Sequence, residues 1–514
     1  MPGRRAGRWA RATRWAPDSG CARPVGQLAT LSSVKRRHVW PRLLAALIGS
    51  SLALLLAPAS SSAHIITERY QAPLPLLAYV AGAALAVAMS FLFVGLRGRS
   101  SLPEGRSTRP GRVPVGLQWT LRIIGLLGWT VIMAQAFLGG VDETADAAGL
   151  FLWVYGWVGV ALGSALVGPV WSWLDPFSTL HMLLGAAARR LRLVGDEAEP
   201  RPYPGRWGIW PAVAGFAVVL WLELVAQASG GRTLALLLLA YTLITLAGMS
   251  WFGRDEWRRH GEVFSVWFGL LGRLAPFALA GRPEEGRLER RPFAAGLFDR
   301  PWSRAELVLL TLGTAAIIFD GLSQTQIYFD LFGRVDLLGQ GPPLINTLVM
   351  AVFFAAVLAL VLGVARGLGT SAVGAGLLPV AIGYLVAHYF VTLIVEGQRI
   401  ILVLNDPLLQ GSDLLPFPWS AFEPTLFLPA ALVWGIQLAA VVGGHVVGAW
   451  AGHAALDKAE GEATTRHQLT LAGLTVLLTS VTLWSLGQAV LQEPAEAAAP
   501  AVVAPLDRDY RPGA

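Results

Sequence analysis

Long apolar stretches, each about the length needed to cross a bilayer, fill most of this chain. Three of them carry an ionisable residue well inside the apolar run: Glu223, Asp320 and His388. A charge in hydrocarbon costs roughly 2.5 to 3.5 kcal/mol on insertion scales, so such residues usually face a partner or a water-filled cavity. The three positions therefore mark the expected functional site.

The composition is that of a membrane protein. Charged residues make up 14% of the chain and hydrophobic residues 54%, whereas a soluble domain carries about 25% charged residues. We predict an all-α, polytopic transmembrane helix bundle whose main partner is the lipid bilayer. Apolar windows of about 20 residues predict about ten spans, near residues 75–96, 117–138, 147–170, 208–229, 232–250, 304–325, 344–366, 371–396, 425–450 and 466–490.

Charge asymmetry orients these spans. The segment 97–113 carries five arginines, whereas 139–146 carries three carboxylates, so the first is predicted to be cytoplasmic and the second external. The alternation that follows predicts a multi-pass protein of a bacterial plasma membrane with both mature termini outside. The net charge of +7 arises in residues 1–42, which hold ten Lys or Arg and one acid, so we predict no nucleic-acid partner.

The first 63 residues are typical of a leader. Basic residues precede an apolar run at 43–58, and the small residues 59–63 follow it, which predicts a secretory signal peptide cleaved after Ala63. An uncleaved first anchor is the alternative. Cleavage would remove Cys21, the single cysteine, and would exclude disulfides and thiolate metal sites from the mature chain.

Residues 64–490 are predicted to form the transmembrane helical domain, and 491–514 a disordered tail rich in Ala and Pro. Segments near 171–193 and 251–303 are mixed in character, and we expect them to lie as amphipathic helices along the inner leaflet. Within them, Asp175-Pro176 is a helix-start signal, and 262–279 is an amphipathic piece interrupted at Pro276. We expect His445, His453 and His467 to be surface or helix-end residues.

The three buried ionisable residues share one depth. Each lies about 15 to 17 residues from the predicted cytoplasmic end of its helix, which places all three in one layer in the outer third of the bilayer. We assign Glu223, Asp320 and His388 as catalytic residues. Polar residues at helical spacing or at the outer helix end are the predicted substrate-binding set: Gln227, Ser323, Gln324, Tyr384, Glu396 and Gln398. The alternative is that these groups only hydrogen-bond between packed helices.

His64 adds the possibility of a metal site. Cleavage after Ala63 would expose its amine and imidazole together, a chelate suited to copper and acceptable to zinc. The predicted ligands of a divalent metal are therefore His64, Glu223, Asp320 and His388. The alternative is that His64 is simply solvated after a cleavage site.

Short motifs resemble a group of bacterial polytopic membrane proteins, some of them labelled fenitrothion hydrolase, an organophosphate-ester-cleaving activity. They are Ala63–Pro75, Trp221–Leu224, Phe319–Ser323, Ala387–Tyr389 and Gln398. The resemblance covers residues 63–490 and implies hydrolysis of an organophosphate-type ester at the buried polar residues.

Three functions remain open from the sequence. The first is a membrane-bound, metal-dependent hydrolase in which metal-bound water attacks an ester reaching the site from the exterior. The second is a transporter or proton-handling protein that uses the same residues to relay protons or bind a cation. The third is a metal chaperone or assembly factor that uses the amine of His64.

Overall fold

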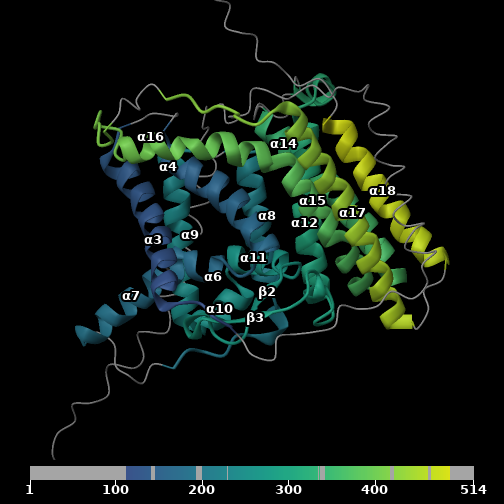
Figure 1. Ribbon diagram of the computed structural model, residues 1–514, viewed down its shortest axis with the longest axis horizontal. Helices are drawn as coiled ribbons and strands as arrows, with labels where there is room; N and C mark the ends of the chain where they lie inside the picture. The colour runs from purple at the N-terminus through teal and green to yellow at the C-terminus, as the bar shows by residue number, and fades with distance from the viewer. Residues whose placement is uncertain are drawn as a thin grey trace, which may run out of the picture. The chain divides into compact units, whose positions relative to one another are not determined.

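The computed structural model describes residues 111–140, 145–192, 199–227, 230–333, 335, 342–416, 422–460 and 465–486. All of them belong to one compact unit, residues 55–514 (Figure 1). The predicted leader with its cleavage site, His64, the first span near 75–96 and the tail after residue 490 lie outside the described residues.

The described chain is helical apart from one small sheet. The elements up to residue 271 are β1 (Gly111–Arg112), α3 (Val115–Leu138), α4 (Ala147–Gly149), the π-helix η2 (Leu150–Val160), α5 (Ala161–Leu166), α6 (Trp171–Leu174), α7 (Pro176–Arg190), η3 (Gly205–Trp207), α8 (Trp210–Leu224), α9 (Gly231–Phe252), α10 (Arg254–His260) and α11 (Val263–Leu271). The remaining elements are β2 (Phe277–Leu279), η4 (Pro283–Glu285), β3 (Arg287–Arg290), η5 (Ala295–Leu297), α12 (Arg304–Ser323), α13 (Gln326–Tyr328), the π-helix η6 (Phe329–Gly333), α14 (Pro342–Leu368), α15 (Thr370–Glu396), η7 (Gly397–Arg399), α16 (Ile400–Asn405), α17 (Ala430–Glu460) and α18 (Thr465–Leu486).

Seven helices in the described part of the chain are long and apolar enough to cross a membrane. They correspond to the spans predicted near 117–138, 147–170, 232–250, 304–325, 344–366, 371–396 and 425–450. The helix predicted at 208–229 is shorter, since α8 ends at Leu224. α18 coincides with the last predicted span but is not among the seven. The all-α, multi-pass membrane class is confirmed, whereas the count of ten spans stays a prediction.

A basic segment and an acidic segment lie at opposite ends of α3. The start of α3 lies beside the Arg-rich strand β3, because Val113 N donates to Gly286 O at 2.8 Å. At the other end of α3, Gln410 donates to Leu138 O at 2.8 Å, which brings the acidic segment after α16 to that end. Figure 1 accordingly shows α16 near α4 and the strands at the opposite end of α3.

α12 and α15 form the buried centre of the bundle. The apolar window of α12 is 94% buried, and it packs against α8, α14, α15 and α18. α15 packs on α17 along a seam of glycines, where a Cβ on Gly448 would lie 2.4 Å from Gly376 O. A Cβ on Gly383 would lie 2.5 Å from Ala440 O. Small residues thus let the two backbones touch, as is common between membrane helices.

The segment predicted to lie along the inner leaflet is instead partly folded into the bundle. The helix predicted over 262–279 ends at Leu271, and Phe277–Leu279 is strand β2 in a sheet of order β1-β3-β2. Seven of the nine residues of α11 are buried, because its apolar face packs against α5, α8 and α12 rather than against lipid. Pro276 removes a helix hydrogen-bond donor, which favours the change to a strand.

Two buried carboxylates start the helices of this region. Asp175 caps α7 by accepting from Phe177 N at 2.9 Å and Ser178 N at 3.0 Å, which confirms the predicted helix start. Glu262 caps α11 by accepting from Ser265 N at 2.6 Å, and the Tyr241 hydroxyl also donates to it. Each carboxylate satisfies amides that a helix start would otherwise leave unpaired.

Arginines fix the chain that follows α11. The Arg273 guanidinium is buried, donates to Leu297 O at 3.2 Å and to Arg300 O at 2.8 Å, and pairs with Glu306 at 3.3 Å. Burial lowers the pKa of Arg273 to about 10, so the side chain remains charged at neutral pH. These bonds hold the C-terminal end of α11 against the start of α12.

Candidate functional site

A buried acid and imidazole meet between two central helices. His388 Nε2 on α15 lies 2.7 Å from Asp320 Oδ2 on α12, and both side chains are 10% exposed. The predicted convergence of these two residues is therefore observed. Bonding the imidazole to the carboxylate compensates part of the cost of removing both groups from water.

The Asp320 carboxylate has further partners on both of its oxygens. Gln324 Nε2 donates to Oδ1 at 2.8 Å, from one turn further along the chain. The Tyr389 hydroxyl donates to Oδ2 at 3.4 Å, and its ring packs edge-on against the His388 ring at a centroid distance of 4.5 Å. Ser323, in contrast, donates to the backbone oxygen of Asp320 at 3.0 Å and so belongs to the helix end.

Tyr389 is a site residue that the sequence reasoning missed. Neighbours in a helix usually point in different directions, yet His388 and Tyr389 both reach Asp320. Trp157, on the π-helix η2, lies close enough to interact with the Tyr389 hydroxyl. A tyrosine directly after an intramembrane histidine was the available signal.

Glu223 approaches the same pair from α8. It lies in the last turn of that helix, and its carboxylate is close enough to interact electrostatically with Asp320 and with Tyr389. Gln227 does not share its helix face, because α8 ends at Leu224 and Gln227 has φ +48°. Glu223, Asp320 and His388 thus lie near one another, as predicted. Gln227, predicted to share the helix face of Glu223, lies beyond the end of α8, so helical spacing does not place it at the site.

Tyr384 belongs to a second, separate polar cluster. Its hydroxyl donates to Thr479 Oγ1 on α18 at 2.6 Å, and His445 Nε2 on α17 lies 2.5 Å from the same oxygen. His445 Nδ1 lies 2.7 Å from Val441 O. These bonds tie three helices together, so the spacing of four between Tyr384 and His388 does not place both at one site.

The expectation that His445 and His453 lie at the surface is wrong. His445 is 1% exposed and His453 is 6% exposed, both on α17. His453 Nε2 lies 3.5 Å from Asp457, one turn away. The glycine seam explains the burial, because it brings α17 so close to α15 that this face of α17 is covered.

Glu396 and Gln398 stabilise the end of α15 and the chain around it. Arg399 Nε lies 2.5 Å from Glu396 Oε2, and Gln398 Nε2 donates to Thr425 O at 2.8 Å. The Tyr155 hydroxyl on η2 donates to Gly397 O at 2.6 Å. Both predicted substrate-binding residues therefore make structural contacts at the C-terminal end of α15.

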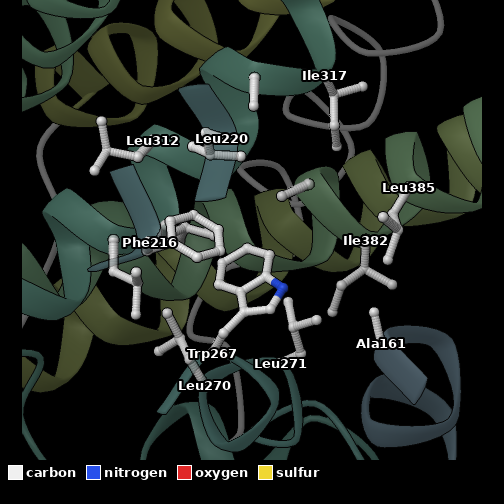
Figure 2. Packing of buried hydrophobic residues seen from close by; sticks show 14 of the residues in the cluster. Ala161, Phe216, Leu220, Trp267, Leu270, Leu271, Leu312, Ile317, Ile382 and Leu385 are labelled. Atoms are coloured by element: carbon white, nitrogen blue, oxygen red, sulfur yellow. The ribbon is translucent and has the colours of Figure 1, made fainter. Parts of the chain in front are cut away.

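An apolar layer separates the polar site from the end of the bundle predicted to face the cytoplasm. Phe216 and Leu220 precede Glu223, and equivalent apolar residues precede Asp320 and His388 on their helices. Figure 2 shows Trp267 of α11 at the centre of this layer, with its ring 4.7 Å from that of Phe216. We call the layer the apolar plug; its members are Phe216, Leu220, Trp267, Leu270, Leu271, Leu312, Ile317, Ile382 and Leu385, all buried.

The plug packs closely against α12. Trp267 contacts Gly313 so closely that a Cβ there would lie 2.4 Å from the ring. Gly313 lies nine residues into α12, or roughly 14 Å at 1.5 Å per residue. Trp267 of α11 thus reaches well into the bundle, alongside the part of α12 that precedes Asp320.

A metal ion held by the protein needs several donor side chains at one point. Within the described residues, no group of three or more His, Cys, Asp or Glu side chains is arranged to hold a metal ion. His388 and Asp320 bond directly to each other, and His64 lies outside the described residues. Zinc or copper binding stays a prediction.

Comparisons with known proteins complete the description of the site. No family model, no curated protein and no solved structure matches the chain. The resemblance to proteins labelled fenitrothion hydrolase therefore remains an expectation from short motifs.

Proposed function

We propose that this multi-pass membrane protein handles protons, and that the Asp320–His388 pair binds and releases the transported proton. The observation that supports this most is the buried hydrogen bond of 2.7 Å between the two side chains. Ionisable groups inside a helix bundle commonly mark proton or ion pathways. Of the functions open from the sequence, this one uses the observed pair without further ligands.

Glu223 gives the pair a second proton-binding group. When His388 is protonated, a single proton shared between Glu223 and Asp320 makes the group electrically neutral. Loss of that proton leaves an uncompensated charge in a low-dielectric interior, which is costly. The deprotonated group is therefore higher in free energy than the neutral one, which favours rapid uptake of another proton from solvent or from a second proton carrier.

The apolar plug supports a direction for this exchange. Its members on α8, α12 and α15 precede Glu223, Asp320 and His388 along those helices, so we expect protons to reach the group from the other side, that of η7 and α16. Tyr389 and Gln324 both donate hydrogen bonds to the Asp320 carboxylate and so position it for proton transfer.

Proton binding can be tested without knowing a cosubstrate. Infrared difference spectra of the purified protein between acidic and alkaline pH should show a carboxyl band that Asp320→Asn removes or shifts. Asp406→Asn, at a carboxylate that accepts from backbone amides outside the bundle, is the matched control. A spectrum unchanged by Asp320→Asn would contradict the proposal. Proton uptake into sealed vesicles, lost in the same variant, would extend it to transport.

The second candidate is an ester hydrolase, favoured by one observation. An imidazole oriented by a carboxylate is the usual arrangement of a general base, and His388 on Asp320 fits it. Ester turnover by the detergent-purified protein, abolished by His388→Gln, would favour this candidate over transport. Metal content that falls in both His388→Ala and Asp320→Ala would support its metal-dependent form.

A further inference from the structure

A cavity apart from the proton site lies between α7, the segment 200–203 that precedes η3, and α10. Its volume is about 650 Å³. Five arginines but only two carboxylates line it: Arg189, Arg201, Arg254, Arg259, Arg282, Asp255 and Glu256. A concave surface with this excess of guanidinium groups attracts anions.

The arginines differ in how they are held. Arg254 pairs with Glu284 at 2.7 Å, and Arg259 pairs with Glu256 at 3.2 Å. Arg201 packs its guanidinium over the Trp251 ring at 4.6 Å, which orients the side chain without neutralising it. Among the described residues, neither Arg189 nor Arg201 has a carboxylate partner, so two cations remain available at the cavity.

His181 reports the electrostatic character of the cavity. The pKa of its imidazole is lowered by burial and by the charges of Arg254 and Arg189. A further cation is therefore disfavoured in this cavity, as expected for a site suited to an anion.

The helix that carries Arg189 also has an apolar surface. Leu183, Leu184 and Leu191 are 43%, 56% and 69% exposed, next to the basic end of the helix at Arg189 and Arg190. Apolar residues followed by arginines are typical of helices at a membrane interface. The cavity would then open at the level of the lipid head groups.

We propose that this cavity binds a phosphate group, either on a phospholipid head group or on a soluble phosphate compound, with Arg189 and Arg201 as its main ligands. Guanidinium groups match phosphate oxygens with paired hydrogen bonds. Basic pockets on the cytoplasmic side of membrane proteins bind anionic lipid head groups in the same way. The site is independent of the proposed proton site.

Calorimetric titration of the full-length protein in neutral detergent tests the proposal. The probes are inorganic phosphate, a short-chain phosphatidate and a short-chain phosphatidylcholine. We expect the phosphatidate to bind and the double variant Arg189→Gln/Arg201→Gln to weaken its binding about tenfold or more, since the variant loses the charge-assisted bonds that both guanidinium groups would make to phosphate. Binding of phosphate and phosphatidate alike indicates a soluble ligand, and binding of phosphatidate alone indicates a lipid.

A matched variant separates a real site from general surface charge. Arg290→Gln/Arg366→Gln removes the same charge from exposed positions that do not line the cavity, and we expect it to change affinity less than twofold, since screened surface charges contribute little. Equal losses in the two double variants, equal binding of phosphatidylcholine, or no binding of phosphate and phosphatidate would overturn the proposal.

Discussion

A charged Asp320–His388 pair should have a larger coupling free energy than a neutral hydrogen bond. A double-mutant cycle measures that coupling free energy. Two unit charges 2.7 Å apart attract each other by about 6 kcal/mol at an effective dielectric constant of 20. Desolvation of buried ions offsets part of this attraction. We therefore expect a coupling free energy of about 3 kcal/mol from Asp320→Ala, His388→Ala and the double variant, within the range known for close charge pairs.

The assay is the free energy of unfolding in mixed detergent micelles for each protein of the cycle. Tyr384 and Thr479 supply a matched neutral pair, hydrogen-bonded at 2.6 Å and buried in the same bundle. The cycle of Tyr384→Phe and Thr479→Ala should give about 0.6 kcal/mol, the usual value for hydrogen bonds between membrane helices. A coupling for Asp320 and His388 no larger than this control would refute a charged pair and, with it, the reasoning for proton binding.

Three further predictions concern the packing around the site. Gly448→Leu should destabilise the protein by about 3 kcal/mol or more, because its Cβ would lie 2.4 Å from Gly376 O; a Tm equal to wild type would contradict this. Trp267→Ala should cost about 3 to 5 kcal/mol of stability and raise passive proton leak into vesicles, measured with an internal pH dye. Burial raises the pKa of the Asp175 carboxyl to about 6, above the usual pKa of about 3.9 for an aspartate, so its contribution to stability should fall by on the order of 3 kcal/mol as pH rises from below 4 to above 6. The free energy of unfolding of Asp175→Asn, measured over the same pH range, should not show this fall.

The fold class followed from the sequence because apolar length and arginine distribution depend on the bilayer alone. Apolar windows therefore predicted helices such as α3, α12 and α14 close to their observed bounds. The strand at Phe277–Leu279 and the burial of α11 were missed, since an amphipathic pattern does not say whether the apolar face meets lipid or protein. Tertiary contacts to α5, α8 and α12 decided that question.

The site was predictable in part for a similar reason. The cost of burying Glu223, Asp320 and His388 identified them without any knowledge of helix packing. Helical spacing correctly placed Gln324 beside Asp320. It failed for Tyr384 on α15, whose hydroxyl bonds to Thr479 on α18, because the sequence of one helix does not say which neighbouring helix each of its residues faces.

The way α11 is held has a consequence for any transport cycle. Glu262 and Arg273 anchor its two ends, through Tyr241 on α9 at one end and Glu306 on α12 at the other. A passage from the proton site to the inner side requires Trp267 to leave its place beside Gly313. Because one anchor is a buried hydrogen bond to a carboxylate and the other a buried ion pair, we expect their rupture to be slow, so that movement of α11 would limit the rate of any transport across the bundle.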